Sequence, residues 1–349
     1  MQANGLRKEA YAAMLLLLLT LGLGACETEL DLPVVSRQNK IVLLGEFIAG
    51  DTMHLRAGQS TSISSSVSTP DIITGLLLQV TEPSGNILTL HGEPDFDTSY
   101  LRTVPFSAAN LIQPGKTYHL KGVHHTLAPV DCRIDVPDAF TASIADTVRT
   151  SFSGKNVMEI KLVLQDNPGA DHYYVVEVVK ESMMVSGSFL LDGNWYDIFF
   201  NKDVYDSLKQ QGPVVTDFDT LLTNQFERIP SHTNDANTEN LKYSSAANGF
   251  RRILIDDRTF SGGSYTLSVF AETDNFDSEF NKGRIVVWVK SVDKEYYDYL
   301  KVYERSTNEL ILNISGVPLK LQGNVTNGLG VVGGVYRNSF PVYYEDFGL

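Results

Sequence analysis

Cys26 is the residue whose chemistry is most directly indicated by its surroundings. It ends the apolar run MLLLLLTLGLGAC at 14–26, and the small residues Gly24 and Ala25 stand directly before it. Small side chains let a peptidase approach the backbone, and the thiol is a soft nucleophile that can accept a diacylglyceryl group. This pattern is typical of a bacterial lipobox. We therefore predict cleavage before Cys26 and lipidation of its thiol.

The segment before Cys26 has the layout of a secretory signal. Arg7 and Lys8 form a short positive region, and an apolar stretch follows. That stretch is too short to span a bilayer, which needs about 20 residues. We predict a signal peptide at 1–25 and a tether at 26–39, with an ordinary signal peptide and a chance cysteine as the alternative. Two or more acyl chains on Cys26 would be a stable membrane anchor.

Composition excludes several classes of protein and site. The formal charge of the 349-residue chain is −14, so its surface would repel nucleic acid and anionic lipid headgroups. The chain has two cysteines, and lipidation of Cys26 leaves Cys132 alone. A disulfide within the chain and a thiolate metal site are then excluded. CRIDV at 132–136 alternates apolar and polar residues, which predicts that Cys132 is a buried strand residue.

Two short motifs match catalytic or cofactor signatures, and both have a simpler structural interpretation. GLGVVG at 328–333 fits the dinucleotide pattern GxGxxG, but the following GVYRN is not helical, which favours a tight β turn or bulge. SVDK at 291–294 fits the SxxK of serine acylases, but no Lys-Thr-Gly follows it. Ser291 or Asp293 is better explained as the N-cap of a helix.

The sequence predicts no metal, no cofactor and no catalytic residue. His124 and His125 would point to opposite sides of an extended segment, and therefore could not share a metal. The turns DGN at 192–194 and DNFDSE at 274–279 contain oxygen ligands for Ca²⁺ but lack EF-hand spacing. Solvated acids are the favoured interpretation of both turns. GxSxG, HExxH and Walker motifs are absent, so we expect a protein that is not an enzyme.

Residues 40–139 have the pattern of short strands joined by turns. MHLR at 53–56 alternates, which places Met53 and Leu55 on one face. EPSG at 82–85 and QPGK at 113–116 are turn sequences. Strands at this spacing over about 100 residues predict an immunoglobulin-like β-sandwich.

Residues 140–349 are predicted to form a second β-rich domain with one or two short helices. Strands are expected at 157–164, 172–179 and 284–290, and a long exposed loop at 224–249. Asp192-Gly193 between two apolar runs predicts a hairpin with both turn residues at positive φ.

Two segments of this domain have helical spacing. Residues 203–211 precede Gly212-Pro213, which would end a helix. Residues 293–306 place Tyr296, Leu300 and Tyr303 on one face of a second helix.

Eight short pieces of the chain, taken in order, form a recognisable pattern. They are CE (26–27), IVLLG (41–45), LIQPGKTY (111–118), LQD (164–166), YY (173–174), DRTFSG (257–262), EYYDYL (295–300) and NVTNGLG (324–330). In this order they resemble the domain of unknown function 4249 family of Bacteroidota lipoproteins. Val332 stands where that family usually has an aromatic residue. The resemblance implies an outer-membrane lipoprotein, often encoded beside TonB-dependent receptors, and it implies no catalytic residue. The acidic ETELD at 27–31 also resembles the surface-export signal of such lipoproteins, or is a solvated tether.

The 16 tyrosines and 17 phenylalanines exceed what a small site would use, and most are expected in β-sheet cores. Tyr196, Phe199 and Phe200 are candidates for a ligand or partner surface. We therefore expect a lipid-anchored outer-membrane protein, on the cell-surface or periplasmic face. It would be a non-enzymatic accessory or ligand-capture partner of a TonB-dependent transporter. An adhesion or envelope-structural lipoprotein is the first alternative, and a hydrolase with an unrecognised carboxylate site is the second.

Overall fold

A computed structural model describes residues 39–61, 72–93, 103–242, 249–273, 281–308 and 321–343. The signal peptide, nearly all of the tether and Cys26 lie outside these residues, so their assignments stay predictions. The calcium alternative at 274–279 lies outside them as well.

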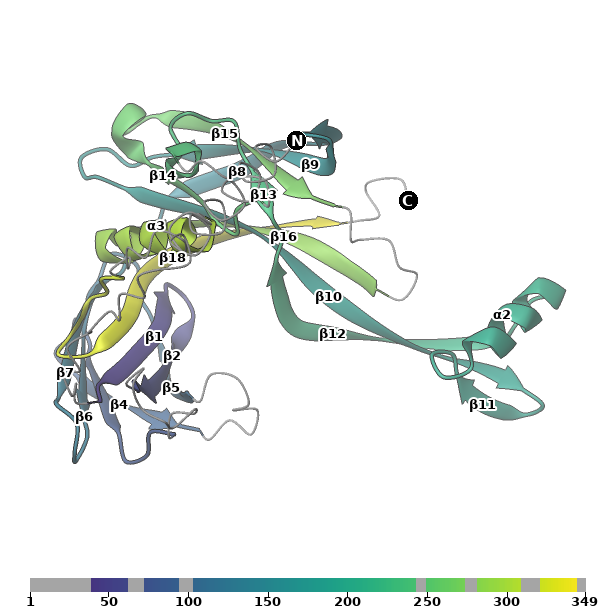
Figure 1. The fold of residues 1–349 in the computed structure, drawn as a ribbon, viewed down its shortest axis with the longest axis horizontal. Coiled ribbons are helices and arrows are strands. Elements are labelled where there is room, and N and C mark those ends of the chain that lie inside the picture. The colour runs from purple at the N-terminus through teal and green to yellow at the C-terminus, as the bar shows by residue number, and fades with distance from the viewer. Residues whose placement is uncertain are drawn as a thin grey trace, which may run out of the picture. The chain divides into compact units, whose positions relative to one another are not determined.

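The described chain is mainly β, as predicted (Figure 1). Its strands are β1 (Ile41–Ile48), β2 (Thr52–Gln59), β3 (Leu77–Thr81), β4 (Ile87–Gly92), β5 (Val104–Leu111), β6 (Thr117–Val123), β7 (Val130–Asp135), β8 (Thr141–Phe152), β9 (Lys155–Gln165), β10 (Tyr173–Leu191), β11 (Asn194–Asp197), β12 (Thr216–Arg228), β13 (Ser231–His232), β14 (Ile253–Asp256), β15 (Ser264–Glu272), β16 (Asn281–Val292), β17 (Val325–Thr326) and β18 (Leu329–Tyr343). Its helices are α2 (Lys202–Gln211) and α3 (Lys294–Asn308), and its 3₁₀ segments include η1 (Glu239–Lys242) and η3 (Asp257–Thr259). No helix among the described residues has the length and apolarity needed to cross a membrane.

The N-terminal strands have a sandwich-like arrangement, consistent with the predicted fold class. β1 pairs with β2 and β2 with β5, while β3 pairs with both β4 and β6, and β6 with β7. Met53, Leu55, Leu120 and Cys132 are buried in one hydrophobic cluster drawn from both groups of strands. The period-two prediction for β2 and the burial predicted for Cys132, which is 1% exposed, are confirmed.

β18 connects the N-terminal strands to the rest of the sheet. It runs parallel to β1, from the pair Val42–Leu329 to the pair Ile48–Val335, and antiparallel to β16. The hydrophobic cluster of the N-terminal strands therefore also contains Val332 from β18. A second cluster is built from side chains between residues 140 and 342. The division of the chain into domains at 139 stays a prediction.

The two faces of β10 and β16 contact different layers. Tyr174, Val176 and Val178 of β10 pack into the cluster that includes Leu162 of β9 and Leu267 of β15. Val175, on the opposite face, packs with residues of α3. Because side chains alternate along a strand, this sheet lies between α3 and the four-stranded sheet of β13, β15, β9 and β8.

The prediction of a long exposed loop at 224–249 is wrong for the described part of that range, 224–242. The end of β12, all of β13 and η1 lie in this range, and Ile229 and Asn240 are buried. The Asn240 amide donates to the Arg252 carbonyl (2.7 Å) and its Oδ1 accepts from the Leu254 N–H (2.8 Å). The polar composition misled the prediction because these side chains satisfy buried backbone groups instead of facing water.

The Asp192-Gly193 hairpin is confirmed, and it joins β10 to β11. Its φ angles are +51° at Asp192 and +82° at Gly193, as a tight turn between right-twisted strands requires. α2 confirms the first predicted helix. β10 extends well beyond the predicted strand at 172–179, and its later part from Val185 to Phe189 pairs with β12.

Asp293, and not Ser291, is the N-cap of α3. The Tyr296 N–H donates to Asp293 Oδ1 (2.7 Å), and the Gly334 N–H donates to the other carboxylate oxygen. One side chain therefore satisfies a free N–H of the first helical turn and an N–H of β18. Burial raises the pKa of Asp293 to about 7, although both hydrogen bonds oppose the shift.

Asp293→Ala should lower the free energy of unfolding by about 2 kcal/mol, because it removes the cap and leaves two buried N–H groups unsatisfied. Asp298→Ala is the matched control, since Asp298 is a half-exposed acid on the same helix. The control should stay within about 0.5 kcal/mol of the wild type in urea unfolding. Equal losses in the two variants would contradict the capping role.

The inner face of α3 differs in part from the prediction. Tyr296 and Leu300 are buried as expected, but Tyr303 is 36% exposed. Tyr297 and Glu304 are buried instead. The burial of Glu304 has a specific cause, which is its position in the charge cluster described below.

In the segment GLGVVG at 328–333, Gly328 directly precedes β18 and the other residues begin the strand. This agrees with the β interpretation and not with a strand–loop–helix unit. Gly330 has a φ of +97°, and a Cβ there would lie 2.0 Å from the carbonyl oxygen of Leu43. The glycine therefore permits close approach of β18 to β1.

Candidate functional site

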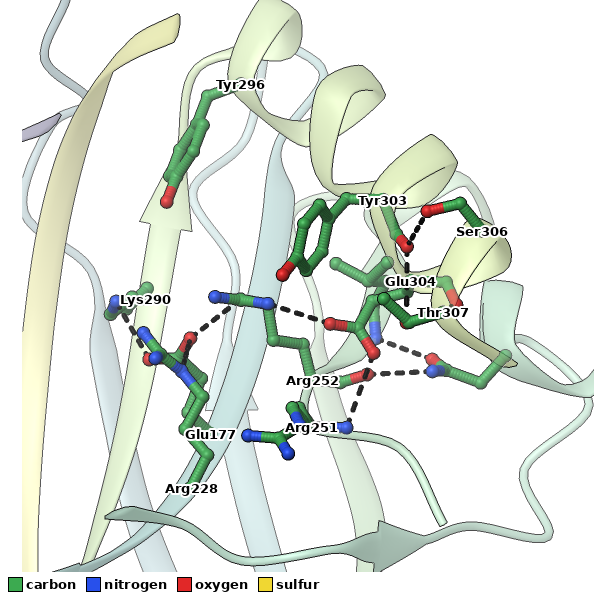
Figure 2. Close-up of polar contacts among 12 residues, drawn as sticks. Glu177, Arg228, Arg251, Arg252, Lys290, Tyr296, Tyr303, Glu304, Ser306 and Thr307 are labelled. Atoms are coloured by element: carbon green, nitrogen blue, oxygen red, sulfur yellow. Dashed lines mark hydrogen bonds and ion pairs between the residues drawn. The ribbon is translucent and has the colours of Figure 1, made fainter. Parts of the chain in front are cut away.

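A cluster of buried charged side chains lies beside α3 (Figure 2). Glu177, in the middle of β10, is at its centre and its side chain has 0% exposure. Its carboxylate contacts Lys290 Nζ (2.9 Å), Arg228 Nε (2.8 Å) and Arg252 Nε (2.9 Å). Three cations therefore compensate one carboxylate that has no access to water.

Glu46 connects this charge cluster to the N-terminal strands. Lys290 Nζ is 2.9 Å from both carboxylate oxygens of Glu46. The Tyr296 hydroxyl donates to Glu46 Oε1 (2.6 Å). These bonds join β1, β16 and α3 at one point.

Glu304 completes the charge cluster on α3. Arg252 Nη1 donates to Glu304 Oε1 (2.8 Å), and the Arg251 N–H donates to Oε2 (3.3 Å). Figure 2 shows the Arg252 guanidinium between Glu177 and Glu304, with Tyr303 beside it. The carboxylates of the charge cluster are Glu46, Glu177 and Glu304, and the cations of the cluster are Arg228, Arg252 and Lys290. The cluster is thus balanced in charge.

The charges of this cluster keep its central acid ionised. Burial alone would raise the pKa of Glu177, but Lys290, Arg228 and Arg252 outweigh burial and lower it to about 2. At Glu46, burial also raises the pKa of the carboxyl, but Lys290 lowers it, and the net pKa lies below the ordinary value. Groups that stay ionised at neutral pH suit ion pairing better than proton transfer. The geometry is therefore that of a structural cluster that fixes β1, β10, β16 and α3 to one another.

Sequence reasoning missed this cluster, although two signals were present. Glu177 interrupts the apolar strand YYVVEVV at 173–179, and Lys290 ends the apolar strand RIVVWVK. A charge on an inward face requires a partner. The partners come from distant parts of the chain, so spacing alone could not identify them.

A second polar cluster lies where β9 ends and β10 begins. Asp166 follows β9, His172 precedes β10 and Asp257 follows β14. His172 Nδ1 is 3.0 Å from Asp166 Oδ1 and 3.5 Å from Asp257 Oδ2. In the part of the chain that the structure describes, these three residues are a group of potential metal ligands. None of the three is among the ligands predicted from the sequence.

A groove of about 330 Å³ borders Asp257 and carries charges of both signs. Three of its acids are paired, with Lys242 2.8 Å from Glu239, Arg258 2.6 Å from Asp256 and Lys301 3.5 Å from Asp298. These three acids are thus compensated by cations, and Asp171 and Asp257 also line the groove.

The predicted surface residues Tyr196, Phe199 and Phe200 lie close together in sequence after the hairpin turn, and Trp195 joins them. We call these four residues the aromatic end. They are 53% (Trp195), 39% (Tyr196), 75% (Phe199) and 81% (Phe200) exposed. Figure 1 shows their elements, β11 and the turn before α2, at the end of the β10–β12 ribbon.

A small aromatic core lies beside Tyr196 of the aromatic end. Phe189 of β10 is fully buried, and its ring centroid is 5.8 Å from that of Tyr196 and 5.6 Å from that of Tyr205 in α2. The rings of Phe199 and Phe200 meet edge to face at 5.3 Å. Tyr196 is therefore supported by the buried Phe189, and Phe199 and Phe200 support each other.

The charged residues around the aromatic end are mainly acidic. Residues 192–217 contain five aspartates and two lysines. Lys202 is 3.2 Å from Asp206, which neutralises one of these acids. The surroundings of the aromatic end thus have an excess of negative charge.

The remaining sequence motifs are not brought together into a site. Ser291 is buried in β16, whereas Lys294 is in α3 and pairs with Asp298. Asp192 forms the hairpin turn and is not in the metal-ligand group found among the described residues. Burial raises the pKa of Cys132 to about 12, so its thiol stays protonated.

The extended conformation assumed for His124 and His125 is not found in the structure. The two residues lie in a bend after β6 instead of an extended strand, and their ring centroids are 4.3 Å apart. His124 Nε2 lies 2.9 Å from the Thr74 carbonyl oxygen, so a backbone group already occupies that nitrogen.

Comparison with known proteins gives one family match. The family model described as "Domain of unknown function (DUF4249)" matches residues 27–339. No curated protein matches the chain. Similar solved structures include a DUF4785 family protein from Legionella pneumophila, with 9% identity over 70% of this chain and 49% of that chain, at a TM-score of 0.19. They also include a Salmonella alpha-2-macroglobulin mutant, with 11% identity over 73% of this chain and 14% of that chain, at a TM-score of 0.22.

The chain thus spans about half of the first solved structure and a small part of the second. Neither similarity extends to function. The family match covers most of the sequence, and on that basis the chain belongs to the DUF4249 family, a family of domains of unknown function.

Proposed function

We propose that this protein is a lipid-anchored outer-membrane protein that binds a protein partner through its aromatic end. In this proposal it is a non-enzymatic accessory of a TonB-dependent transporter. The observation that carries the proposal is the set of four exposed aromatic side chains within six residues of the chain, of which Tyr196 packs against the buried Phe189. Exposed aromatic residues are enriched at the centres of protein interfaces, where they contribute much of the binding energy.

The charges around the aromatic end favour a protein over a lipid surface as its binding partner. Five aspartates against two lysines in residues 192–217 would be repelled by anionic headgroups. A partner with an apolar centre and a basic rim would complement them. The lipobox pattern at Cys26 supports the anchor, and the family resemblance supports a TonB-dependent receptor as the partner.

The charge pattern of the groove gives the hydrolase alternative less support. Its paired acids Glu239, Asp256 and Asp298 are already compensated by cations. The adhesion alternative explains the anchor but gives no role to the aromatic end.

A crosslinked pull-down from native outer membranes tests the proposal. The lipidated wild type should recover a TonB-dependent receptor in stoichiometric amount, and the double variant Phe199→Ser/Phe200→Ser should recover at least tenfold less. The reason is that losing two interface aromatics costs about 1–2 kcal/mol each, and 1.4 kcal/mol corresponds to about tenfold in affinity.

The control is Ile87→Ser/Leu111→Ser, which removes two apolar side chains that are 63% and 62% exposed on the N-terminal strands. It should recover the receptor like the wild type. Full recovery by the Phe199/Phe200 variant would exclude the aromatic end as the contact. Absence of the receptor from the wild-type sample would exclude the accessory role.

A further inference from the structure

We propose that Asp166, His172 and Asp257 bind a divalent transition-metal ion of the zinc or manganese class. The proposal is independent of the partner-binding function, since these residues are not part of the aromatic end. One imidazole nitrogen and two carboxylate oxygens form a donor set that suits such ions, whereas Mg²⁺ and Ca²⁺ prefer oxygen ligands alone.

The distances between the three donor atoms fit coordination of one ion. His172 Nδ1 is 3.0 Å from Asp166 Oδ1 and 3.5 Å from Asp257 Oδ2, and all three atoms lie within 4.8 Å of one another. Ligand bonds of about 2.0–2.2 Å at tetrahedral or octahedral angles place neighbouring donor atoms about 3.0–3.5 Å apart.

Two of the donor atoms make no hydrogen bond in the structure, although they lie within ion-pair distance of each other. His172 Nδ1 and Asp257 Oδ2 are buried and have no hydrogen-bond partner. Asp257 as a whole is 1% exposed, so water does not compensate its carboxylate. A buried carboxylate oxygen and a buried ring nitrogen without partners are costly, and a shared cation would satisfy both.

The surroundings of the three residues hold the donor atoms in place. The Tyr174 hydroxyl donates to Asp166 Oδ1 (2.5 Å), and the Gly262 N–H donates to Asp166 Oδ2 (2.6 Å). The Asp257 N–H donates to the His172 carbonyl (3.1 Å), which ties these two ligands to each other. Such outer hydrogen bonds orient metal ligands in known sites.

The position of the proposed metal site determines how an ion reaches it and how a bound ion would affect thermal stability. Asp257 also lines the charged groove, which gives an ion a route from solvent. Asp166 follows a strand of the four-stranded sheet, whereas His172 and Asp257 flank strands of the larger sheet. A bound ion would therefore join the two sheets and raise the melting temperature.

The test is titration of the full mature chain, stripped with a chelator, with ZnCl₂ and separately with CoCl₂. We expect one equivalent of Zn²⁺ by calorimetry, a raised Tm and visible absorption bands with Co²⁺. Asp257→Asn and His172→Gln should each weaken binding at least about 100-fold and abolish the Co²⁺ bands. Asp171→Asn, which removes a neighbouring acid of the groove, should bind within threefold of the wild type.

Absence of stoichiometric binding by the wild type would overturn the proposal. Undiminished binding by Asp257→Asn and His172→Gln would also overturn it, because the ion would then be held elsewhere. If one of these variants fails to fold by circular dichroism, the other variant and the wild-type Co²⁺ spectrum still decide.

Discussion

Glu177→Gln should lower the free energy of unfolding by about 3–5 kcal/mol. The substitution keeps the shape of the side chain but removes the charge that Lys290, Arg228 and Arg252 share. Breaking a buried ion pair from one side costs this much because the remaining charges stay buried without compensation. Urea unfolding at pH 7 measures the loss. Glu227→Gln, at an exposed position of the neighbouring strand β12, is the control and should be near neutral.

A double-mutant cycle separates pairing from packing. Lys290→Met alone should also destabilise, whereas Glu177→Gln/Lys290→Met should lose less than the sum of the single losses. Additive losses would show that Glu177 and Lys290 are not coupled.

The lowered pKa of Glu177 predicts that the free energy of unfolding depends on pH. The pKa of Glu177 falls from 4.5 to about 2 on folding, so its stabilisation is fully present above about pH 4.5. It is lost as the pH falls from there to about 2, and the shift corresponds to about 3 kcal/mol. Between pH 5 and pH 3 the wild type should therefore lose more stability than Glu177→Gln. Parallel curves for the two proteins would contradict the role of Glu177.

Gly330→Ala should destabilise the protein by about 4 kcal/mol or more. A side chain at a φ of +97° is strained by about 1–3 kcal/mol, and the new Cβ would lie 2.0 Å from the Leu43 carbonyl oxygen. The backbone of β1 would have to move, which weakens its parallel pairing with β18 and the packing of both strands.

Thermal unfolding measures this effect, with Gly212→Ala as the control because nothing lies within 4 Å of a Cβ at that position. Gly334→Ala is a second variant, since its Cβ would lie 2.2 Å from the Asp135 carbonyl oxygen. Wild-type stability of both Gly330→Ala and Gly334→Ala would refute the close approach of the β18 backbone to its neighbours.

Features that depend on neighbouring residues could be predicted from the sequence. The alternation of Met53 and Leu55 and the Asp192-Gly193 turn follow from period-two burial and positive φ. Capping chemistry predicted an N-cap at Ser291 or Asp293, and the structure shows that it is Asp293. The lipobox pattern at Cys26 is likewise local, because a peptidase reads adjacent residues.

Features that depend on distant pairing could not be predicted. Tyr296 and Glu46 are 250 residues apart, yet they share a hydrogen bond in the charge cluster. Asp166, His172 and Asp257 meet because β14 pairs with β10 and β9 ends nearby. The composition of 224–249 suggested exposure, but tertiary contacts bury Asn240.

The sequence by itself determined the mainly β class, the hairpin, the helices and the candidate anchor. The tertiary structure alone decided which charges compensate one another and which rings and ligands come together. The physical reason is that steric and capping preferences act within a few residues of the chain. The pairing of buried charges and ligand atoms depends instead on which strands become neighbours.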